Sequence, residues 1–296
     1  MEKSEMIRTY VVTGATSGIG YAIAEGLLAK GMSVIGIGRS PERCKAAQDT
    51  LASRHPQGRA AYLLADLSLQ TEVRGLRSAI DHQLVAWKHT TLDGLVNNAG
   101  TFTFHRTITG EGFENQWAVN HLAPFLLTHE LLPLLQSAPS ARVISVSSGS
   151  HFRTRMNWDD LQFKQRYPPL RAYQQSKLAN VLFIAELRRR LGPDSSITAF
   201  AADPGLVNTR IGLKSRSPLA RLVWDLIRRR GIQPEESARG IRELLLAPDI
   251  VGSPHLYWKH GKPMQPNPQA LDPAAGKRLW ELSEHMCGLE PRPHIT

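Results

Sequence analysis

The sequence predicts an α/β protein built on one doubly wound parallel sheet of about seven strands, with helices on both faces. Short apolar runs alternate with longer segments whose apolar residues recur at helical spacing, which is the pattern of βαβ units. Right-handed crossovers then bring successive strands into a single sheet covered on both sides. Because no linker, repeat or low-complexity stretch divides the chain, we expect residues 1–296 to form a single domain.

The first half of the chain supplies four of the strands. A short buried strand leads through a glycine-rich turn into an apolar helical pattern that ends at Gly31. Ser40 and Pro41 suit the N-cap and the first position of the helix after the second strand. A further helix is expected over about 70–86. The four strands are predicted at residues 8–13, 33–38, 60–64 and 92–97.

The second half of the chain continues this alternation and then departs from it. A helix over about 112–135 precedes a fifth strand at 142–146, and the helix that contains Tyr173 precedes a sixth strand at 197–201. After Gly205 the pattern is less regular. The segments expected there are helices at 218–230, 234–246 and 273–286, an edge strand at 255–258, and irregular Pro-rich stretches at 261–268 and 290–296.

The composition is typical of a soluble globular protein, with 42% hydrophobic and 21% charged residues. No apolar run approaches the roughly 20 residues needed to span a bilayer. The polar N-terminus, Met1-Glu2-Lys3-Ser4-Glu5, leads straight into a strand, so we expect no secretory signal. Cys44 and Cys287 are too few and too far apart for a disulfide framework or a metal site. We therefore expect a cytoplasmic protein without a metal.

The chain carries a basic surplus, with 36 Lys and Arg against 26 Asp and Glu. Such a surplus suits nucleic acid, anionic lipid or a phosphate-rich cofactor. The basic residues are dispersed apart from triplets at 188–190 and 228–230, and the first triplet closes a helix, where cations suit the negative end of the dipole. Since no nucleic-acid-binding motif accompanies the charge, we expect no nucleic-acid partner.

The glycine-rich turn after the first strand is the first chemical signal. Gly14 permits a tight turn, Gly18 lets the backbone approach a phosphate, and Gly20 allows close packing of helix on strand. The following helix offers free N–H groups and a positive dipole to a pyrophosphate. A plain tight turn is the alternative, but the place between first strand and first helix favours a dinucleotide site. That site would also include Ser17 and Ile19.

The end of the second strand bears on the choice of cofactor. An acidic residue there usually binds the ribose 2′-hydroxyl of NAD, whereas an Arg accommodates the 2′-phosphate of NADP. This chain has Arg39 and no acid, which favours NADP(H) over NAD(H), the alternative being a surface arginine. Asp66 and Leu67 come after the third strand, and both are expected among the cofactor contacts. Asp66 is predicted either to accept a hydrogen bond from the adenine amine or to cap a helix.

Tyr173 and Lys177 lie four residues apart in an apolar helical pattern, so they are expected on one face of a helix. A neighbouring ammonium group stabilises a phenolate and lowers a pKa that is normally about 10. For the pair alone, an ordinary Tyr and Lys one turn apart is the alternative, because the spacing arises easily by chance.

Taken together, these motifs resemble those of the short-chain dehydrogenase/reductase family over about residues 8–210. Segments 112–128 and 176–183, and the long insertion between Ser148 and Tyr173, are similar to its retinol dehydrogenase-like branch. The resemblance implies a Rossmann-type fold and a nicotinamide cofactor. The motifs that carry it are Thr13-Gly14-xxx-Gly18-x-Gly20, Asn97-Asn98-Ala99-Gly100, Asn120, Ser148, Tyr173-xxx-Lys177 and Pro204-Gly205.

The resemblance implies specific roles. Tyr173 would be the general acid or base, and Lys177 would lower its pKa and hold the nicotinamide ribose. Ser148, rather than its neighbour Ser147, would hydrogen-bond the substrate oxygen. Asn120 would bind a water that relays protons from Lys177, although a structural role for this Asn is an alternative. The remaining cofactor contacts would be Asn98, Ala99 and Gly100 on the adenine-ribose side, and Pro204, Gly205, Val207 and Thr209 at the nicotinamide.

Two departures from the branch limit what is carried over. The branch usually has His before Pro-Gly, where this chain has Asp203, which puts the nicotinamide end in doubt. The apolar anchor at the start of membrane-bound retinol dehydrogenases is absent, so their substrate does not follow directly. Family members commonly pair through the helix that bears Tyr173, and its outer face here is apolar, so a homodimer is an open expectation.

Segment 206–230 corresponds to the family's substrate lid. Its apolar face would suit a bulky lipophilic alcohol or ketone. Ordinary packing against the sheet and peripheral contact with an anionic membrane surface are the alternatives.

The sequence therefore predicts an NADP(H)-dependent oxidoreductase that interconverts an alcohol and its aldehyde or ketone. The alternatives are a reductase of an activated double bond or acyl intermediate, and a non-catalytic nucleotide-sensing or scaffolding protein. The presence of all four predicted catalytic residues weighs against the non-catalytic reading.

Overall fold

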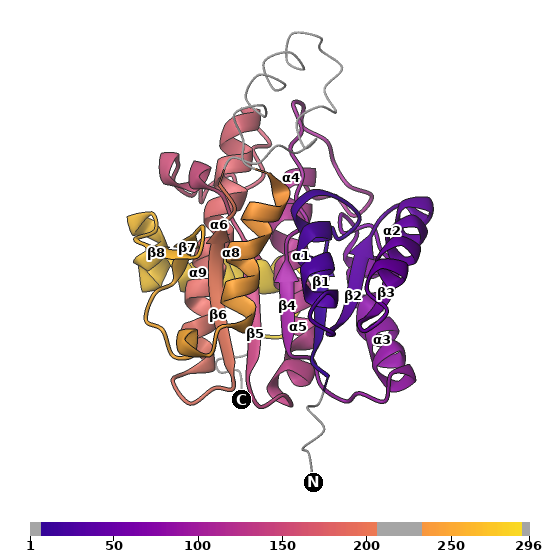
Figure 1. Cartoon of the computed structure of the whole chain (residues 1–296). Helices are drawn as coiled ribbons and strands as arrows, with labels where there is room; N and C mark the ends of the chain where they lie inside the picture. The colour runs from indigo at the N-terminus through magenta and orange to yellow at the C-terminus, as the bar shows by residue number, and fades with distance from the viewer. Residues whose placement is uncertain (1–6, 206–232, 292–296) are drawn as a thin grey trace.

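A computed structural model of the chain describes residues 7–205 and 233–291, and its centre is one sheet of eight strands in the order β3-β2-β1-β4-β5-β6-β7-β8 (Figure 1). Strands β1 to β7 run parallel, and β8 is antiparallel to β7. The predicted α/β class is confirmed, with one strand more than expected. The strands are β1 (Thr9–Thr13), β2 (Ser33–Gly38), β3 (Arg59–Leu64), β4 (Gly94–Asn97), β5 (Ala141–Val146), β6 (Ile197–Asp203), β7 (Tyr257–Lys259) and β8 (Lys262–Met264).

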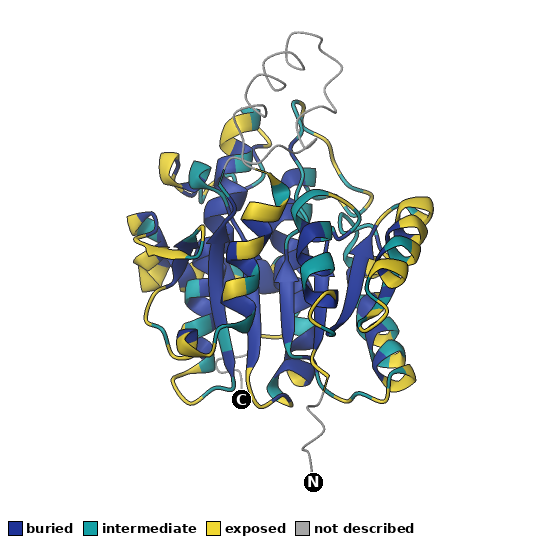
Figure 2. Ribbon diagram, in the orientation of Figure 1, coloured by how far each residue is buried: buried dark blue, intermediate teal, exposed yellow. Residues whose placement is uncertain are grey.

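Helices cover both faces of this sheet. Alternate residues of β1 enter different cores: Val11 packs in the core beneath α3, α5, α6 and α9, and Val12 in the core beneath α1 and α8. Figure 2 shows the central strands β1, β2, β4 and β5 as buried, whereas α2 and α3 present exposed outer turns. The helices are α1 (Gly18–Leu28), α2 (Pro41–Arg54), α3 (Gln70–Ala86), α4 (Asn115–Trp117), α5 (Ala123–Gln136), α6 (Pro169–Leu191), α8 (Pro234–Leu246) and α9 (Pro273–Met286), with short turns η1 (Ala118–Leu122), η2 (Gly149–Arg153), η3 (Pro248–Ile250) and η4 (Pro268–Leu271).

The helix predicted over 112–135 is divided into three parts. A short α4 is followed by a π-helical turn, η1, and then by α5. The turn η1 contains Asn120 at its centre. Every residue from Leu122 to Leu127 is apolar, so the sequence does not reveal the shift in helical phase that an extra residue introduces, and the pattern predicts one continuous helix. Such turns occur frequently at functional sites.

The stretch predicted to be irregular at 261–268 contains a strand. His260 and Gly261, with φ of 49° and 72°, form a two-residue turn that joins β7 to β8. The prediction was wrong because Pro263 argues against a strand. Proline is tolerated here because β8 is the last strand of the sheet, where no further ladder needs its N–H.

The apolar outer face of α6 is covered by α9. The Trp280 ring lies 5.0 Å from the ring of Phe125 and 6.0 Å from that of Phe183, both measured between centroids. Gly276 of α9 lies against α6, where a Cβ would be 3.4 Å from the Glu186 carboxylate. The homodimer stays a prediction, but the apolar face on which it rested packs within this chain.

Two further sequence expectations concern the substrate lid and the membrane. The lid and basic helix expected at 206–230 lie outside the described residues. Across 7–205 and 233–291, every helix falls short of the length or the apolar character that crossing a bilayer requires.

Candidate active site

The predicted site residues gather at one edge of the sheet. The glycine-rich turn follows β1, Asn98 follows β4, Ser148 follows β5, and Pro204 follows β6. The carboxyl ends of parallel strands all meet at this edge, and open α/β sheets bind ligands there.

The glycine-rich turn has the geometry of a phosphate cradle. Gly14 and Gly18 have φ of 67° and 57°, a region that favours glycine. A Cβ on Gly20 would lie 2.4 Å from the carbonyl oxygen of Gly14 and 2.5 Å from the Asn98 amide nitrogen, so no side chain fits. Ser17 is the N-cap of α1 but makes no side-chain cap. The N–H groups of the first turn of α1 are thereby left to bind an anion.

Thr13 ties this turn to the end of β4. Its Oγ1 accepts hydrogen bonds from the N–H groups of Asn98 and Ala99, each at 2.9 Å. The Asn98 side chain returns a hydrogen bond of 2.9 Å to the Thr13 carbonyl. The structure thus uses the Asn98 side chain to join two strand ends, a role that sequence reasoning missed.

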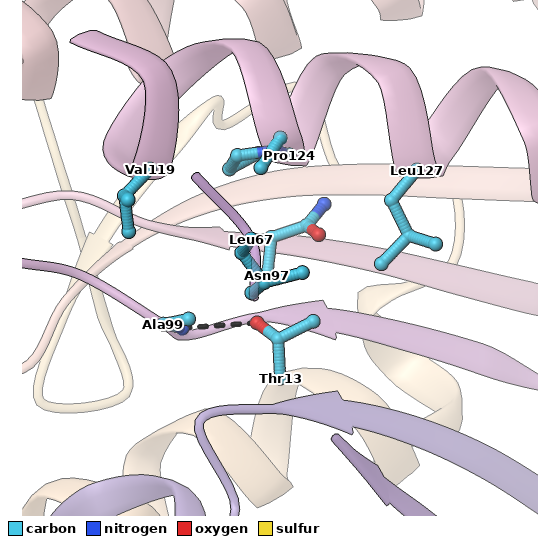
Figure 3. Close-up of a pocket in the computed structure, with 8 residues that line it drawn as sticks. Thr13, Leu67, Asn97, Ala99, Val119, Pro124 and Leu127 are labelled. Carbon is cyan, nitrogen blue, oxygen red and sulfur yellow. Dashed lines mark hydrogen bonds between the residues drawn. The ribbon is translucent and has the colours of Figure 1, made fainter. Parts of the chain in front are cut away.

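A small pocket opens beside Ala99 at the same sheet edge (Figure 3). Leu67 lines it together with Ala99, so the structure brings together two residues that were predicted to contact the cofactor. Asn97 also lines it, with a buried side-chain oxygen that has no hydrogen-bond partner. The lining residues are Thr13, Leu67, Asn97, Ala99, Val119, Ala123, Pro124 and Leu127.

Arg39 and Asp66 lie next to each other at the ends of β2 and β3. An Arg39 guanidinium nitrogen is 3.8 Å from an Asp66 carboxylate oxygen, and the Arg39 side chain is 68% exposed. The other Asp66 oxygen accepts a hydrogen bond from the Ser68 N–H at 3.0 Å. Asp66 therefore closes a turn ahead of α3. The first N–H groups of α3, at Gln70 and Thr71, are bonded by the Glu111 carboxylate instead.

The structure brings Tyr173, Ser148 and Lys177 together. Tyr173 and Lys177 share one face of α6, with the Lys177 ammonium nitrogen 5.8 Å from the centroid of the Tyr173 ring. The Ser148 hydroxyl lies close enough to the Tyr173 phenol to lower its pKa. Lys177 is buried, and its ammonium group donates to the Val146 carbonyl at 3.0 Å.

The two adjacent serines have different surroundings. The Ser147 hydroxyl is buried and donates to the backbone carbonyl of Lys177 at 2.8 Å, which ties β5 to α6. The Ser148 hydroxyl faces Tyr173 and accepts a 3.3 Å hydrogen bond from the N–H of Ser150. Of the two hydroxyls, that of Ser148 is therefore placed for chemistry.

Asn120 is fully buried and hydrogen-bonded to protein groups. Its side-chain oxygen accepts from the Thr101 N–H at 2.7 Å, and its amide nitrogen donates to the Thr101 carbonyl and the Ser176 hydroxyl, both at 3.0 Å. A Cβ on Gly100 would lie 3.4 Å from both the Asn120 oxygen and the Lys177 ammonium. Asn120 thus borders the site, and the water relay through it stays a prediction.

The protonation of the pair departs from the sequence expectation. Burial raises the pKa of Tyr173 to about 12, with the Asp203 charge adding to this and the hydrogen bond with Ser148 opposing it. Burial lowers the pKa of Lys177 to about 8, against the opposing charge of Asp203. The predicted lowering of the Tyr173 pKa by Lys177 stays a prediction, because desolvation of the phenolate is the largest influence on the Tyr173 pKa in this structure.

The segment after β6 is shaped around glycine. Gly205 has φ of 75°, and a Cβ there would lie 2.4 Å from the ring of His260. Its N–H donates to the Asp203 carboxylate at 2.8 Å, and Ser237 donates to the Pro204 carbonyl at 2.6 Å. The predicted contacts Val207 and Thr209 lie outside the described residues.

Aromatic rings beside Tyr173 are a feature that sequence reasoning missed. The Phe102 ring lies 5.7 Å from the Tyr173 ring and 4.9 Å from the Phe104 ring, both edge to face. Phe102 and Phe104 come shortly after the Asn98-Ala99-Gly100 motif, and this position in the sequence was the signal that could have placed them at the site. An apolar wall therefore stands next to the phenol.

Comparison with known proteins agrees with this geometry. Residues 8–219 match the family model described as short chain dehydrogenase. The chain is 35% identical to mouse retinol dehydrogenase 14, over 95% of this chain and 86% of that protein, and 33% identical to human polyprenol dehydrogenase, again over 95% and 86%. A crystal structure of an uncharacterized Mycobacterium paratuberculosis protein is 33% identical, with a TM-score of 0.71 over 96% of this chain and 94% of that one.

Proposed function

The chain belongs to the short-chain dehydrogenase family, and from that premise we propose that it is an NADP(H)-dependent oxidoreductase that interconverts an alcohol and its aldehyde or ketone. The observation that carries the proposal is the convergence of Tyr173, Ser148 and Lys177 at the carboxyl edge of the sheet. A phenol and a hydroxyl that lie side by side can both hydrogen-bond one substrate oxygen.

Each of these groups has a role in carbonyl reduction. The nicotinamide supplies the hydride when it is bound. Ser148 donates a hydrogen bond to the carbonyl oxygen as negative charge develops there, and Tyr173 delivers the proton. With its pKa raised to about 12, Tyr173 is protonated at neutral pH, which is the form that an acid needs. Lys177 holds positive charge beside the phenol and steadies the phenolate that remains.

The residues at the cofactor edge fit a dinucleotide phosphate. The turn at Gly14 to Gly20 excludes side chains, and α1 leaves its first N–H groups open. Arg39 stands at the end of β2 with a largely exposed guanidinium. Its ion pair with Asp66 is long and exposed, and such pairs contribute little, so Arg39 is free to turn toward a 2′-phosphate. These features favour NADP(H) over NAD(H).

We propose a lipophilic substrate. Phe102 and Phe104 form an apolar wall beside Tyr173, and aromatic side chains commonly line pockets for apolar ligands. Two of the relatives are named as dehydrogenases of retinol and polyprenol, which are lipophilic alcohols. A lid at 206–230, outside the described residues, would complete the pocket.

The setting of the enzyme completes the proposal. We place it in the cytoplasm as a single domain, since Cys44 and Cys287 are buried and free and a reducing compartment keeps thiols in that state. Its partners would be small molecules rather than nucleic acid. Peripheral membrane contact through the basic helix at 218–230 stays a prediction.

The proposal is tested by nucleotide binding and turnover. Fluorescence titrations with NADPH and NADH measure the preference, and NADPH oxidation is followed across a panel of aldehydes, ketones and retinoids. We expect tighter binding of NADPH and turnover of apolar carbonyl compounds. A protein that bound neither nucleotide would contradict the oxidoreductase function itself.

A further inference from the structure

A buried carboxylate lies beneath the catalytic pair. Asp203 is the last residue of β6 and is 3% exposed. It is paired in register with Lys259 of β7, as Ala201 is with Tyr257. Because alternate residues share a face, Asp203, Tyr257 and Lys259 all lie on the side of the sheet that α6 covers.

Only one of the two Asp203 carboxylate oxygens accepts a hydrogen bond from the backbone. One oxygen accepts the Gly205 N–H at 2.8 Å and shapes the turn after β6. The other oxygen is buried without a hydrogen bond, and so is the hydroxyl of Tyr257. The ammonium of Lys259 is 3.8 Å from that second oxygen and is 39% exposed. The Tyr257 hydroxyl faces Asp203 as a second weak partner, and burying a carboxylate that is paired so poorly is costly, which calls for a function.

The residue between this unbonded oxygen and Ser148 is a glycine, so no side chain occupies the space there. Gly149 follows Ser148, and a Cβ on Gly149 would lie only 3.1 Å from that oxygen. Val146, whose carbonyl accepts the Lys177 ammonium at 3.0 Å, is paired with Ala202, the residue before Asp203. The ammonium and the carboxylate therefore occupy neighbouring strand ends.

The other groups that face Asp203 do not neutralise it. His151 of η2 is buried, with one ring nitrogen 2.8 Å from the Ser148 carbonyl and the other accepting the Asn267 N–H at 3.2 Å. These contacts fit the neutral ring, whose pKa burial lowers. Tyr257 is buried and its pKa is raised, first by burial and then by Asp203. Within the described residues, Lys177 and Lys259 are the cations left to respond.

We propose that Asp203 is a positioning residue that keeps the buried ammonium of Lys177 charged beside Tyr173, and so holds the catalytic pair in its working protonation state. The proposal rests on the proposed function, because it assumes that Lys177 acts as a cation at the nicotinamide ribose.

The electrostatics agree in sign with this role. Burial lowers the pKa of Lys177 to about 8, and the charge of Asp203 raises it. Without the carboxylate the pKa of Lys177 would fall further, and the ammonium would lose its proton more readily. The same charge raises the pKa of Tyr173 and favours the protonated phenol.

The test follows the affinity for NADPH as a function of pH, by fluorescence titration between about pH 7 and pH 10. It compares the unchanged protein with Asp203→Asn and Lys259→Gln, and Lys177→Met identifies the titration step that belongs to Lys177. Asn keeps the shape of Asp203 and an oxygen for the Gly205 N–H. Lys259→Gln removes a positive charge from the same carboxylate without touching α6.

We expect the affinity to weaken as Lys177 loses its proton. In Asp203→Asn this step moves to lower pH, on the order of one unit. In Lys259→Gln it moves to higher pH and by less, because Lys259 is partly exposed. A step that stays in place in Asp203→Asn would overturn the proposal. Should Asp203→Asn fail to fold, an unmoved or lowered step in Lys259→Gln would overturn it alone.

This design separates two failures. If the unchanged protein binds no NADPH, the proposed function fails and takes the role of Asp203 with it. If it binds NADPH and the pH step does not respond to either variant, the proposed function is not contradicted and the role of Asp203 fails.

Discussion

The cofactor edge around β1 and β2 and the catalytic edge around β5, β6 and α6 are built by different means. The first depends mainly on backbone, with glycines that have no room for a Cβ and an open helix N-terminus. The exposed Arg39 side chain stands beside them. The second is made of buried side chains: Lys177, whose pKa burial lowers, and Asp203 are both almost inaccessible to solvent. Steric fit thus governs the cofactor edge, whereas electrostatics governs the catalytic edge.

The largest effect is expected at the catalytic edge, where Ser148 and Ser147 are each replaced in turn. Ser148→Ala removes a hydrogen-bond donor to the developing oxyanion, so turnover should fall by about 100- to 1000-fold. Ser147→Ala removes a buried tie to the backbone of Lys177 and should cost about 1 kcal/mol of unfolding free energy.

Steady-state rates and denaturant unfolding measure both effects. Equal loss of turnover in the two variants would mean that Ser148 has no special place beside Tyr173.

A methyl group should disrupt the cofactor edge. In Gly20→Ala the new Cβ meets the Gly14 carbonyl, a backbone group that cannot move aside. We expect NADPH affinity to fall at least about tenfold and unfolding free energy to fall by about 1–3 kcal/mol.

The matched control is Gly75→Ala on α3, where nothing lies within 4 Å of the added Cβ. It should raise stability by about 0.4–1 kcal/mol and leave NADPH binding unchanged. Tolerance of Ala at Gly20 would show that the tight turn is not essential.

The smallest of these effects is a change in cofactor preference. Arg39→Asp places a carboxylate where a 2′-phosphate would bind, so the ratio of NADPH to NADH affinity should fall by about tenfold. The effect is modest because the Arg39 side chain is exposed and screened by solvent.

Arg59→Asp is the control, since it makes the same charge change at the opposite end of β3. An unchanged ratio in Arg39→Asp would remove Arg39 from the cofactor site.

The sequence anticipated the layered fold because periodicity reports burial directly. Alternating strands and helices, together with the cap at Ser40, predicted most elements near their observed bounds. It missed β8 because Pro263 is acceptable only on the outermost strand, and strand order is a tertiary property. It missed the π-helical turn at Asn120 because residues 122–127 are all apolar and hide a one-residue shift in helical phase.

The site was anticipated in its residues more than in its physics. The predicted Tyr173, Ser148 and Lys177 do come together, yet the raised pKa of Tyr173 depends on desolvation, which no spacing reveals. The tie between Thr13 and Asn98 joins residues 85 positions apart. In the sequence, Asp203 was notable only because it replaces the His that the related branch usually has before Pro-Gly. Its neighbours in space are defined by the pairing of β6 with β7.

The central claim is that Tyr173 transfers the proton, and Tyr173→Phe tests it most directly. Phe keeps the ring and its packing on Phe102 but removes the hydroxyl. With the best carbonyl substrate from the panel, we predict that turnover falls by about 100-fold or more, while NADPH affinity by fluorescence titration stays within about twofold. Turnover that survives in Tyr173→Phe would contradict the account.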